Sequence, residues 1–183
     1  MNRASAYIVG PSDAAGMAVA DLARRIGFAS VAPYGGVALA ERQSQRTPLC
    51  FFLFAPVEDV RIVGRVSAAI RFCTRGTLRF SPLIYFSPSP SLEAITACMR
   101  MGFDDVITLP FTQGRVEERL HRQVGQALVY YDVPSYFGPD RVRMDNLLDP
   151  VEQRKTGSYR RLEIIRHLAT GVNVLRDDIY ISD

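Results

Sequence analysis

The stretch Leu49-Cys-Phe-Phe-Leu-Phe-Ala55 decides the fold of this chain. It is apolar at every position, without the alternation of apolar and polar residues that marks a half-buried strand, and Pro56 ends it. A strand of this kind is typical of a parallel sheet that is buried on both faces. We therefore predict that residues 49–55 form a central strand of such a sheet.

Short apolar runs and helical stripes alternate on both sides of this stretch. Strands are predicted at residues 6–9, 30–32, 83–86 and 106–108, and helices from Ser12 or Asp13 to Ile26 and at 36–43, 57–72, 91–101 and 112–130. Strands that alternate with helices call for a parallel sheet with right-handed crossovers and helices on both faces. The predicted fold is α/β, a doubly wound, flavodoxin-like sheet of five parallel strands.

The pattern changes at about residue 133. Residues that interrupt helices and strands follow one another there: Pro134, Gly138, Pro139 and Pro150. We predict one domain over residues 1–132 and a largely irregular C-terminal tail or linker over 133–183, with a short helix at Tyr159–Ala169. Because its apolar residues are spread too thinly for a second core, the tail is expected to contribute little to stability. Truncation after Tyr131 should then leave the melting temperature nearly unchanged.

Composition excludes several classes of protein. Of the 183 residues, 48% are hydrophobic and 22% are charged, which is ordinary globular usage. A net charge of +3 with a pI near 8.9 is too mild for a dedicated nucleic-acid binder. No apolar run approaches the roughly 18 residues of a membrane span, and Gly10-Pro11 interrupts the first run before a signal-peptide core forms. A cytoplasmic location is therefore predicted, with no membrane span.

Cysteine and histidine give no sign of a metal or redox site. Cys50, Cys73 and Cys98 are widely spaced and lie in apolar or helical stretches, so we interpret them as core thiols. His121 and His167 have no Cys or acid at a ligand spacing and are interpreted as solvated. We predict no metal and no cofactor.

The segment Met101-Gly-Phe-Asp-Asp-Val-Ile-Thr-Leu-Pro-Phe111 resembles the end of a bacterial response-regulator receiver (CheY-like) domain. In that family a helix leads through Gly-Ala and acidic residues into a strand, then through Lys-Pro-Phe into the last helix. Pro48, Pro56 and Pro82, which flank the third and fourth predicted strands, support the resemblance. It covers residues 6 to about 130, and it implies a CheY-like fold in a bacterial two-component pathway.

Receivers carry out metal-assisted phosphoryl transfer, and the resemblance implies where each group would stand. The family's acidic pair, phosphoacceptor Asp, hydroxyl and Lys correspond here to Gly10 and Pro11, Phe54, Ser87 and Leu109. Only the hydroxyl is retained, and no carboxylate occurs within residues 49–56. The resemblance therefore implies a degenerate pseudo-receiver, and we predict that the protein is not an enzyme and has no catalytic residues.

Receivers commonly dock or dimerise through the fourth helix, fifth strand and fifth helix, which the resemblance places within residues 92–130. The candidate interface residues are Arg100, Val106, Arg115, Arg119 and Arg122. The predicted function is a phosphorylation-independent signalling or protein-interaction module whose partner is another protein or a second copy of the chain.

Two other interpretations remain open. A small-molecule or nucleotide-binding module would place its site at the carboxyl ends of the strands, near Gly10, Ser12 and Ser87. The basic residues of the tail would suit nucleic acid or anionic lipid, although a solvated tail is the simpler account. They are Arg154, Lys155, Arg160, Arg161 and Arg166.

Overall fold

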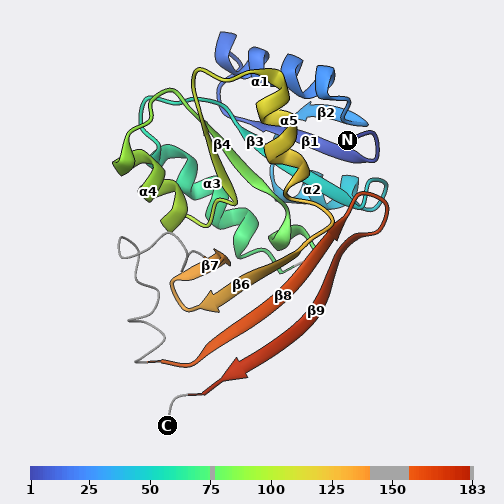
Figure 1. Cartoon of the computed structure of the whole chain (residues 1–183), viewed down its shortest axis with the longest axis vertical. Helices are drawn as coiled ribbons and strands as arrows, with labels where there is room; N and C mark the ends of the chain where they lie inside the picture. The colour runs from blue at the N-terminus through green and yellow to red at the C-terminus, as the bar shows by residue number, and fades with distance from the viewer. Residues whose placement is uncertain (75–76, 141–156, 182–183) are drawn as a thin grey trace.

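The computed structural model describes residues 1–74, 77–140 and 157–181 (Figure 1). The first 121 residues contain the strands β1 (Ala4–Val9), β2 (Ser30–Pro33), β3 (Leu49–Phe54), β4 (Leu83–Ser87) and β5 (Asp105–Thr108). Their helices are α1 (Ala14–Ile26), α2 (Val37–Ser44), α3 (Arg61–Arg71), α4 (Leu92–Arg100) and α5 (Gln113–His121), with a single 3-10 turn η1 (Leu78–Phe80). Strand and helix alternate along the chain as the sequence predicts.

The five strands form one parallel sheet in the order β2-β1-β3-β4-β5. This order is that of the doubly wound, flavodoxin-like fold, which CheY shares. The predicted fold class is therefore confirmed. The apolar stretch that predicted the fold is β3, at the centre of the sheet and buried at all six positions.

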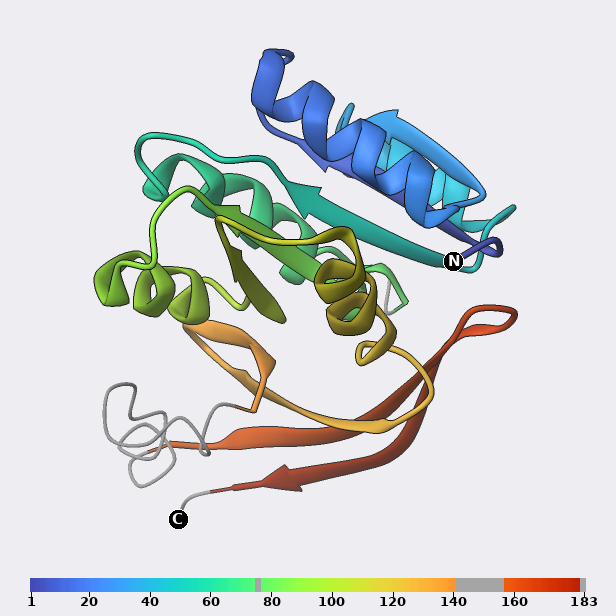
Figure 2. The ribbon, with the colours of Figure 1, turned by 45° about the horizontal axis from the view of Figure 1, so that its top comes forward.

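Helices cover both faces of the sheet (Figure 2). Side chains from α1 and α5, such as Leu22 and Leu120, pack on one face. Side chains from α2, α3 and α4, such as Ile70 and Cys98, pack on the other. Because β3 lies between two packed layers, it can be apolar throughout.

Local signals set the helix limits. The Asp13 carboxylate accepts the N–H of Gly16 at 2.9 Å at the start of α1, and Gly27 ends that helix at a φ of 86°. The hydroxyl of Ser91 accepts the N–H of Ala94 at the start of α4. These residues satisfy backbone groups that a helix end would otherwise leave unpaired.

A second sheet follows the first. Its strands are β6 (Ala127–Val133), β7 (Tyr136–Pro139), β8 (Tyr159–His167) and β9 (Gly171–Tyr180). They pair antiparallel in the order β7-β6-β8-β9. The described residues of the C-terminal tail are thus mostly strand, whereas residues 141–156 of the expected tail lie outside the described residues.

Two element predictions are wrong, and both concern this sheet. The helix expected at residues 112–130 ends at His121, because Gly125 adopts a φ of 78° and residues 127–132 pair with β8. The helix expected at Tyr159–Ala169 is strand β8, in which buried residues alternate at Leu162, Ile164 and Arg166. Period-two burial is the mark of a strand with one face on a core.

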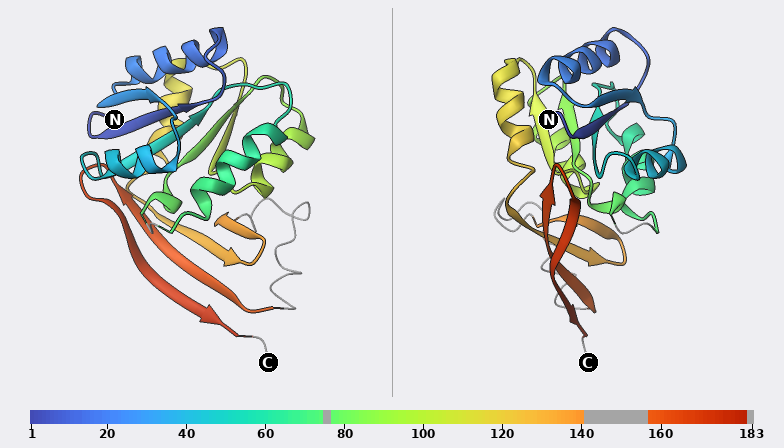
Figure 3. Two further views of the ribbon diagram at one scale, coloured as in Figure 1. Left: turned by 180° about the vertical axis from the view of Figure 1, so that it is seen from behind. Right: turned by 90° about the vertical axis from the view of Figure 1, so that its right-hand side faces the viewer.

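The second sheet packs against the amino-terminal edge of the parallel sheet (Figure 3). A small core joins the two sheets, in which Phe80 of η1 contacts Tyr130 and Phe137 with ring centroids 5.4 and 5.2 Å apart. At the β8–β9 turn, a Cβ on Gly171 would lie 2.8 Å from the carbonyl oxygen of Pro48, so the turn lies against the start of β3. Because β6 ends at Val133, the domain boundary predicted between residues 132 and 133 falls inside this strand.

In the part of the chain that the structure describes, no helix is both long and apolar enough to cross a bilayer.

Candidate functional site

The structure brings the five degenerate positions to the carboxyl-terminal edge of the parallel sheet. Val9 pairs with Phe54, so Gly10 and Pro11 follow β1 beside the end of β3. Ser87 ends β4 beside Thr108, and Leu109 follows β5. Open α/β sheets bind ligands at this edge, which makes it the first candidate site.

Apolar rings fill the place where the resemblance implies a phosphoacceptor. The side chain of Phe54 has no solvent exposure. Its ring meets Phe103 edge to face, with centroids 4.7 Å apart, and Phe103 in turn contacts Tyr85 at 6.1 Å. Aromatic pairs of this kind stabilise a core, and the phenyl rings of Phe54 and Phe103 offer no group that binds a metal ion or accepts a phosphoryl group.

Glycine is required where the resemblance implies the acidic pair. Gly10 adopts a φ of 140°, and a Cβ there would lie 3.1 Å from the Cβ of Ala55. Any larger residue would be strained in this conformation. Because Pro11 also lacks a carboxylate, this position supplies no side-chain oxygen for a cation.

The retained hydroxyl is engaged within its own loop. Ser87 is buried, and its Oγ donates to the carbonyl oxygen of Ser89 at 2.6 Å. Leu109 is 41% exposed and donates its N–H to the Ser87 carbonyl at 3.0 Å. The Ser87 hydroxyl and the Leu109 side chain therefore form no phosphate-binding pair.

An open cleft of about 560 Å³ lies between the loops that follow β3 and β4. Its charged lining residues are Glu58, Asp59, Arg61 and Glu93. The Asp59 carboxylate accepts the Nε of Arg61 at 2.9 Å, and this hydrogen bond lowers the pKa of Asp59. Among the described residues, no group of three or more His, Cys, Asp and Glu side chains is placed to hold a metal ion.

The expected interface residues are not equivalent in the structure. Val106 is buried and packs in the core between the sheet and α3 and α4. Arg119 donates to Asp105, with Nε and Oδ2 2.7 Å apart, and Arg122 pairs with Glu118. Arg100 and Arg115 are exposed. Val106 is therefore a core residue, and the other four residues of the predicted interface are all arginines.

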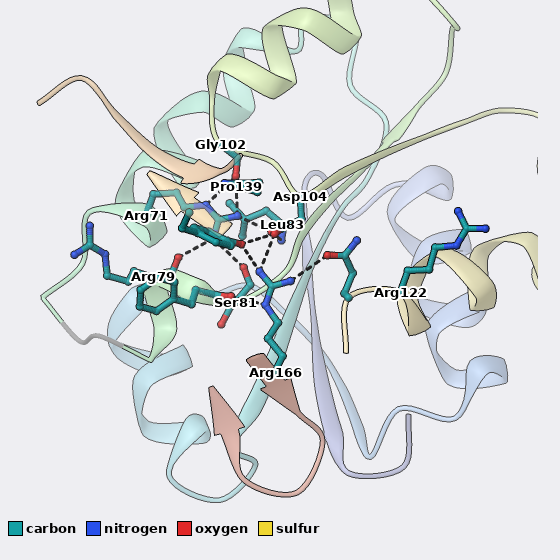
Figure 4. Close-up of polar contacts among 12 residues, drawn as sticks. Arg71, Arg79, Ser81, Leu83, Gly102, Asp104, Arg122, Pro139 and Arg166 are labelled. Carbon is teal, nitrogen blue, oxygen red and sulfur yellow. Dashed lines mark hydrogen bonds and ion pairs between the residues drawn. The ribbon is translucent and has the colours of Figure 1, made fainter. Parts of the chain in front are cut away.

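At the opposite, amino-terminal edge lies a feature that the sequence analysis missed. Arg71 of α3, Asp104 before β5, Tyr130 of β6 and Arg166 of β8 form a buried ionic cluster (Figure 4). The side chains of Arg71, Asp104 and Arg166 are each at most 2% exposed. The cluster joins α3 and the start of β5 to two strands of the second sheet.

Asp104 is the centre of this cluster. Its Oδ2 accepts a hydrogen bond from the Nη2 of Arg71 at 2.6 Å and another from the N–H of Leu83 at 2.8 Å. Its Oδ1 accepts the Nη2 of Arg166 at 2.7 Å and the hydroxyl of Tyr130. A buried carboxylate that accepts four hydrogen bonds, two from cations, has its desolvation compensated.

The two guanidinium groups are held by backbone carbonyls as well. Arg71 donates to the carbonyl oxygens of Gly102 at 2.7 Å and Ser81 at 2.9 Å. Arg166 donates to the carbonyl oxygen of Phe80 at 2.8 Å. The two arginines therefore bind carbonyl groups just after α4 and at the end of η1, and they hold these backbone segments in place.

Burial by itself would raise the pKa of Asp104, but the charges of Arg166 and Arg71 outweigh it and hold the pKa well below its usual range. Burial also raises the pKa of Tyr130, so its hydroxyl remains a proton donor. Asp104 is thus ionised at neutral pH. The cluster attaches the second sheet to the parallel sheet.

The sequence contains only weak signals of this cluster. Asp104 lies in the segment that resembles receivers, and Arg71 lies within the helix predicted at residues 57–72. Arg166 belongs to the tail residues interpreted as solvated, and it is fully buried. Of the other four, Arg160 and Arg161 pair with Asp177 and Asp178, while Arg154 and Lys155 lie outside the described residues.

The cysteines and histidines match their predicted roles in part. Cys50 and Cys98 are free and buried, and burial raises the pKa of both thiols to about 12, so both stay protonated. Cys73 is free and only half-buried. His121 is exposed, and His167 is half-buried.

No protein-family model and no curated protein matches the chain. Solved structures that it resembles include a CheY-like protein from Pseudomonas aeruginosa PAO1, at 14% identity and a TM-score of 0.48 over 64% of this chain and 98% of that one. Another is a response regulator in red light signalling of R. palustris, at 15% identity and a TM-score of 0.41 over 64% of this chain and 89% of that one. The fold assignment itself follows from strand order and direction.

Proposed function

We propose that this protein is a phosphorylation-independent signalling or protein-interaction module, a pseudo-receiver of a bacterial two-component-like pathway. The burial of Phe54 against Phe103 carries the proposal. A receiver needs a carboxylate at this position as nucleophile and metal ligand, and a ring enclosed by other rings supplies neither.

Neighbouring groups do not replace the lost chemistry. Glu58 and Asp59 lie beyond Pro56, on the loop that lines the open cleft, and Arg61 already binds Asp59. No lysine stands at Leu109 to bind a phosphoryl oxygen. The protein therefore acts by binding and not by catalysis.

The module acts through a protein partner or a second copy of the chain. The face made by α4, β5 and α5 is one candidate docking surface, with Arg100 and Arg115 exposed on it and Leu109 at its carboxyl end. Its exposed charges suit an acidic partner. With no phosphorylation to switch it, this surface is available at all times.

Incubation with acetyl phosphate and Mg²⁺ tests the proposal, with the intact mass as the readout. We expect the mass to stay unchanged, while an ordinary receiver treated alongside gains one phosphoryl group. The Phe54→Asp variant should also stay unmodified, because Gly10 and Pro11 provide no carboxylate for the metal. A phosphoryl group on an acid-labile residue of the wild-type protein would falsify the proposal.

The open cleft favours a second candidate function, a small-molecule or nucleotide-binding module. Its volume of about 560 Å³ lies within the range of ligand pockets. A ligand that binds only the folded state raises the melting temperature as its concentration rises. A thermal-shift screen of nucleotides and cyclic dinucleotides, repeated on an Ala94→Trp variant that narrows the cleft, tests this function. A shift seen only with the wild-type protein supports the second candidate.

A further inference from the structure

The described sheets have four edge strands, and one of them is unlike the others. β2, β5 and β7 each contain four residues, whereas β9 contains ten. An edge strand presents unpaired N–H and C=O groups along its free side, and proteins usually keep such edges short. β9 therefore offers the longest free backbone edge in the described molecule (Figures 1 and 3).

Exposed apolar side chains gather on the same strand. Of eleven exposed large apolar residues, five lie within residues 174–181: Val174, Leu175, Ile179, Tyr180 and Ile181. The α4–β5–α5 region contributes only Leu92 and Leu109. Neighbouring exposed apolar residues beside a free edge mark an interaction site, whereas scattered ones do not.

Charged side chains occupy the middle of β9. Asp177 pairs with the buried Leu162, so it lies on the face toward the body of the molecule, where Arg160 binds it with Nε and Oδ1 2.6 Å apart. Arg176 and Asp178 lie on the opposite face, where they form an ion pair of 2.8 Å. The strand thus has opposite charges two residues apart on one face.

We propose that β9 pairs antiparallel with β9 of a second copy, which joins the second sheets of both copies into one continuous sheet. The inference rests on the proposed function, because it names the partner and the surface of an interaction module. Edge pairing of this kind satisfies the free backbone groups of both strands.

The charges on β9 select one register. A two-fold axis perpendicular to the sheet leaves every residue on the same face of the joined sheet. Each residue of β9 therefore lies opposite a residue of the second copy whose side chain is on that face. An axis through Asp177 places Arg176 of each copy opposite Asp178 of the other. The four side chains form a set in which positive and negative charges alternate. The two Asp177 side chains meet at the axis, but each already binds its own Arg160. Opposite charges facing across strands stabilise a pair.

Apolar contacts accompany this register. It brings Ile179 beside Leu175 of the second copy, on either side of the central charges. Val174 takes no part, because it pairs with the buried Ile164 on the body face, whereas Tyr180 pairs with Tyr159 on the opposite face. Leu175 is the extra residue of a β-bulge, since Glu163 pairs with Arg176 and Ile164 with Val174. One pair of strands forms an interface at the small end of the range, about 1,200 Å² or less. We therefore expect a dimer that dissociates on dilution.

Sedimentation of the full chain over a dilution series tests the proposal through its charges. Arg176→Asp makes a copy acidic at both positions, and Asp178→Arg makes a copy basic at both, so each alone should dimerise at least about tenfold more weakly. An equimolar mixture of these two variants should form a heterodimer, because every charge again meets its opposite. The double variant with the two residues exchanged should dimerise like the wild type.

Apolar variants supply a matched control. Ile179→Lys should abolish dimerisation, whereas Met17→Lys, at a residue of α1 with similar exposure, should leave it intact; the two side chains are 68% and 60% exposed. Thermal unfolding of each variant separates loss of dimer from loss of fold. Because both residues are exposed, both variants should melt near the wild-type temperature.

A wild-type protein that stays monomeric at every concentration overturns the inference, and so does a dimer that survives Ile179→Lys. Failure of the mixed variants to form a heterodimer overturns the register. None of these results bears on phosphorylation, which the mass measurement tests separately. Failure of this inference is thus distinguishable from failure of the proposed function.

Discussion

The two edges of the parallel sheet carry opposite chemistry. At the carboxyl-terminal edge, where the resemblance implies charged groups, Phe54 is buried among aromatic rings. At the amino-terminal edge, the buried ionic cluster of Arg71, Asp104, Tyr130 and Arg166 holds the second sheet. Buried charge in this molecule therefore serves the attachment of one sheet to another.

The difference follows from what each edge must accommodate. A phosphorylation site needs charges that reach solvent and substrate, whereas this edge is stabilised by the packed rings of Phe54 and Phe103. The joint between the two sheets has several backbone carbonyls that need donors, including those of Phe80, Ser81 and Gly102. Arginine satisfies several acceptors at once because its five donors form a fixed fork.

Removal of the second sheet should have the largest effect. Truncation after Tyr131 deletes Arg166 and leaves Asp104 with one cationic partner, while it also uncovers Phe80. The burial of Arg166 thus reverses the expectation from the sequence that the tail contributes little. We expect the truncated chain to lose cooperative unfolding, measured by calorimetry and near-UV circular dichroism. A sharp transition near the wild-type temperature would show that the sheets are energetically independent.

A charge placed at the carboxyl-terminal edge should be almost as damaging. Phe54→Asp removes a buried ring and buries a carboxylate without a partner, at a cost of about 5 kcal/mol in the free energy of unfolding. Ile62→Asp is the matched control, because Ile62 is exposed on α3, and it should change that free energy by about 0.5 kcal/mol or less. Urea denaturation measures both. Equal costs at the two positions would contradict the apolar character of this edge.

Loss of one cation from the amino-terminal edge should come next. Arg166→Ala leaves part of the Asp104 charge uncompensated and should lower the free energy of unfolding by about 4 kcal/mol. Arg160→Ala removes an arginine from the same strand, where it forms a more exposed ion pair with Asp177, and should cost about 1 kcal/mol or less. Similar costs for the two substitutions, from urea denaturation, would show that the buried cluster stabilises no more than a surface pair.

The pH dependence of stability should show a smaller effect of the same cluster. Because the pKa of Asp104 is lowered by folding, its stabilisation is present above the unfolded value of about 3.9 and is lost as pH falls toward the folded value. In that acid range the stability of the wild type should fall by about 1.4 kcal/mol per pH unit more steeply than that of Asp104→Asn. Urea titrations from pH 5 downward measure the two slopes. Parallel slopes would mean that folding does not lower the pKa of Asp104.

Particular residues show how far sequence reasoning reached. The run Leu49–Ala55, the helix from Ser12 or Asp13 to Ile26 and the helix at 91–101 were predicted elements that the structure confirms. The absence of a carboxylate from residues 49–56 was also readable, because it can be seen in the sequence itself. Each of these signals acts within a few residues of the chain, so no long-range contact is needed to interpret it.

The second sheet was not readable in this way. β8 pairs with β6 across 28 to 38 positions of sequence, and neither strand has the continuous apolar character of β3. Arg166 is buried only because β8 places it beside Asp104, which lies 62 residues earlier. The sequence by itself therefore determined the parallel sheet and the apolar residue at the end of its central strand. Tertiary structure alone decided which arginines are buried and which strand is left as a free edge, because burial and pairing depend on partners that are distant in the chain.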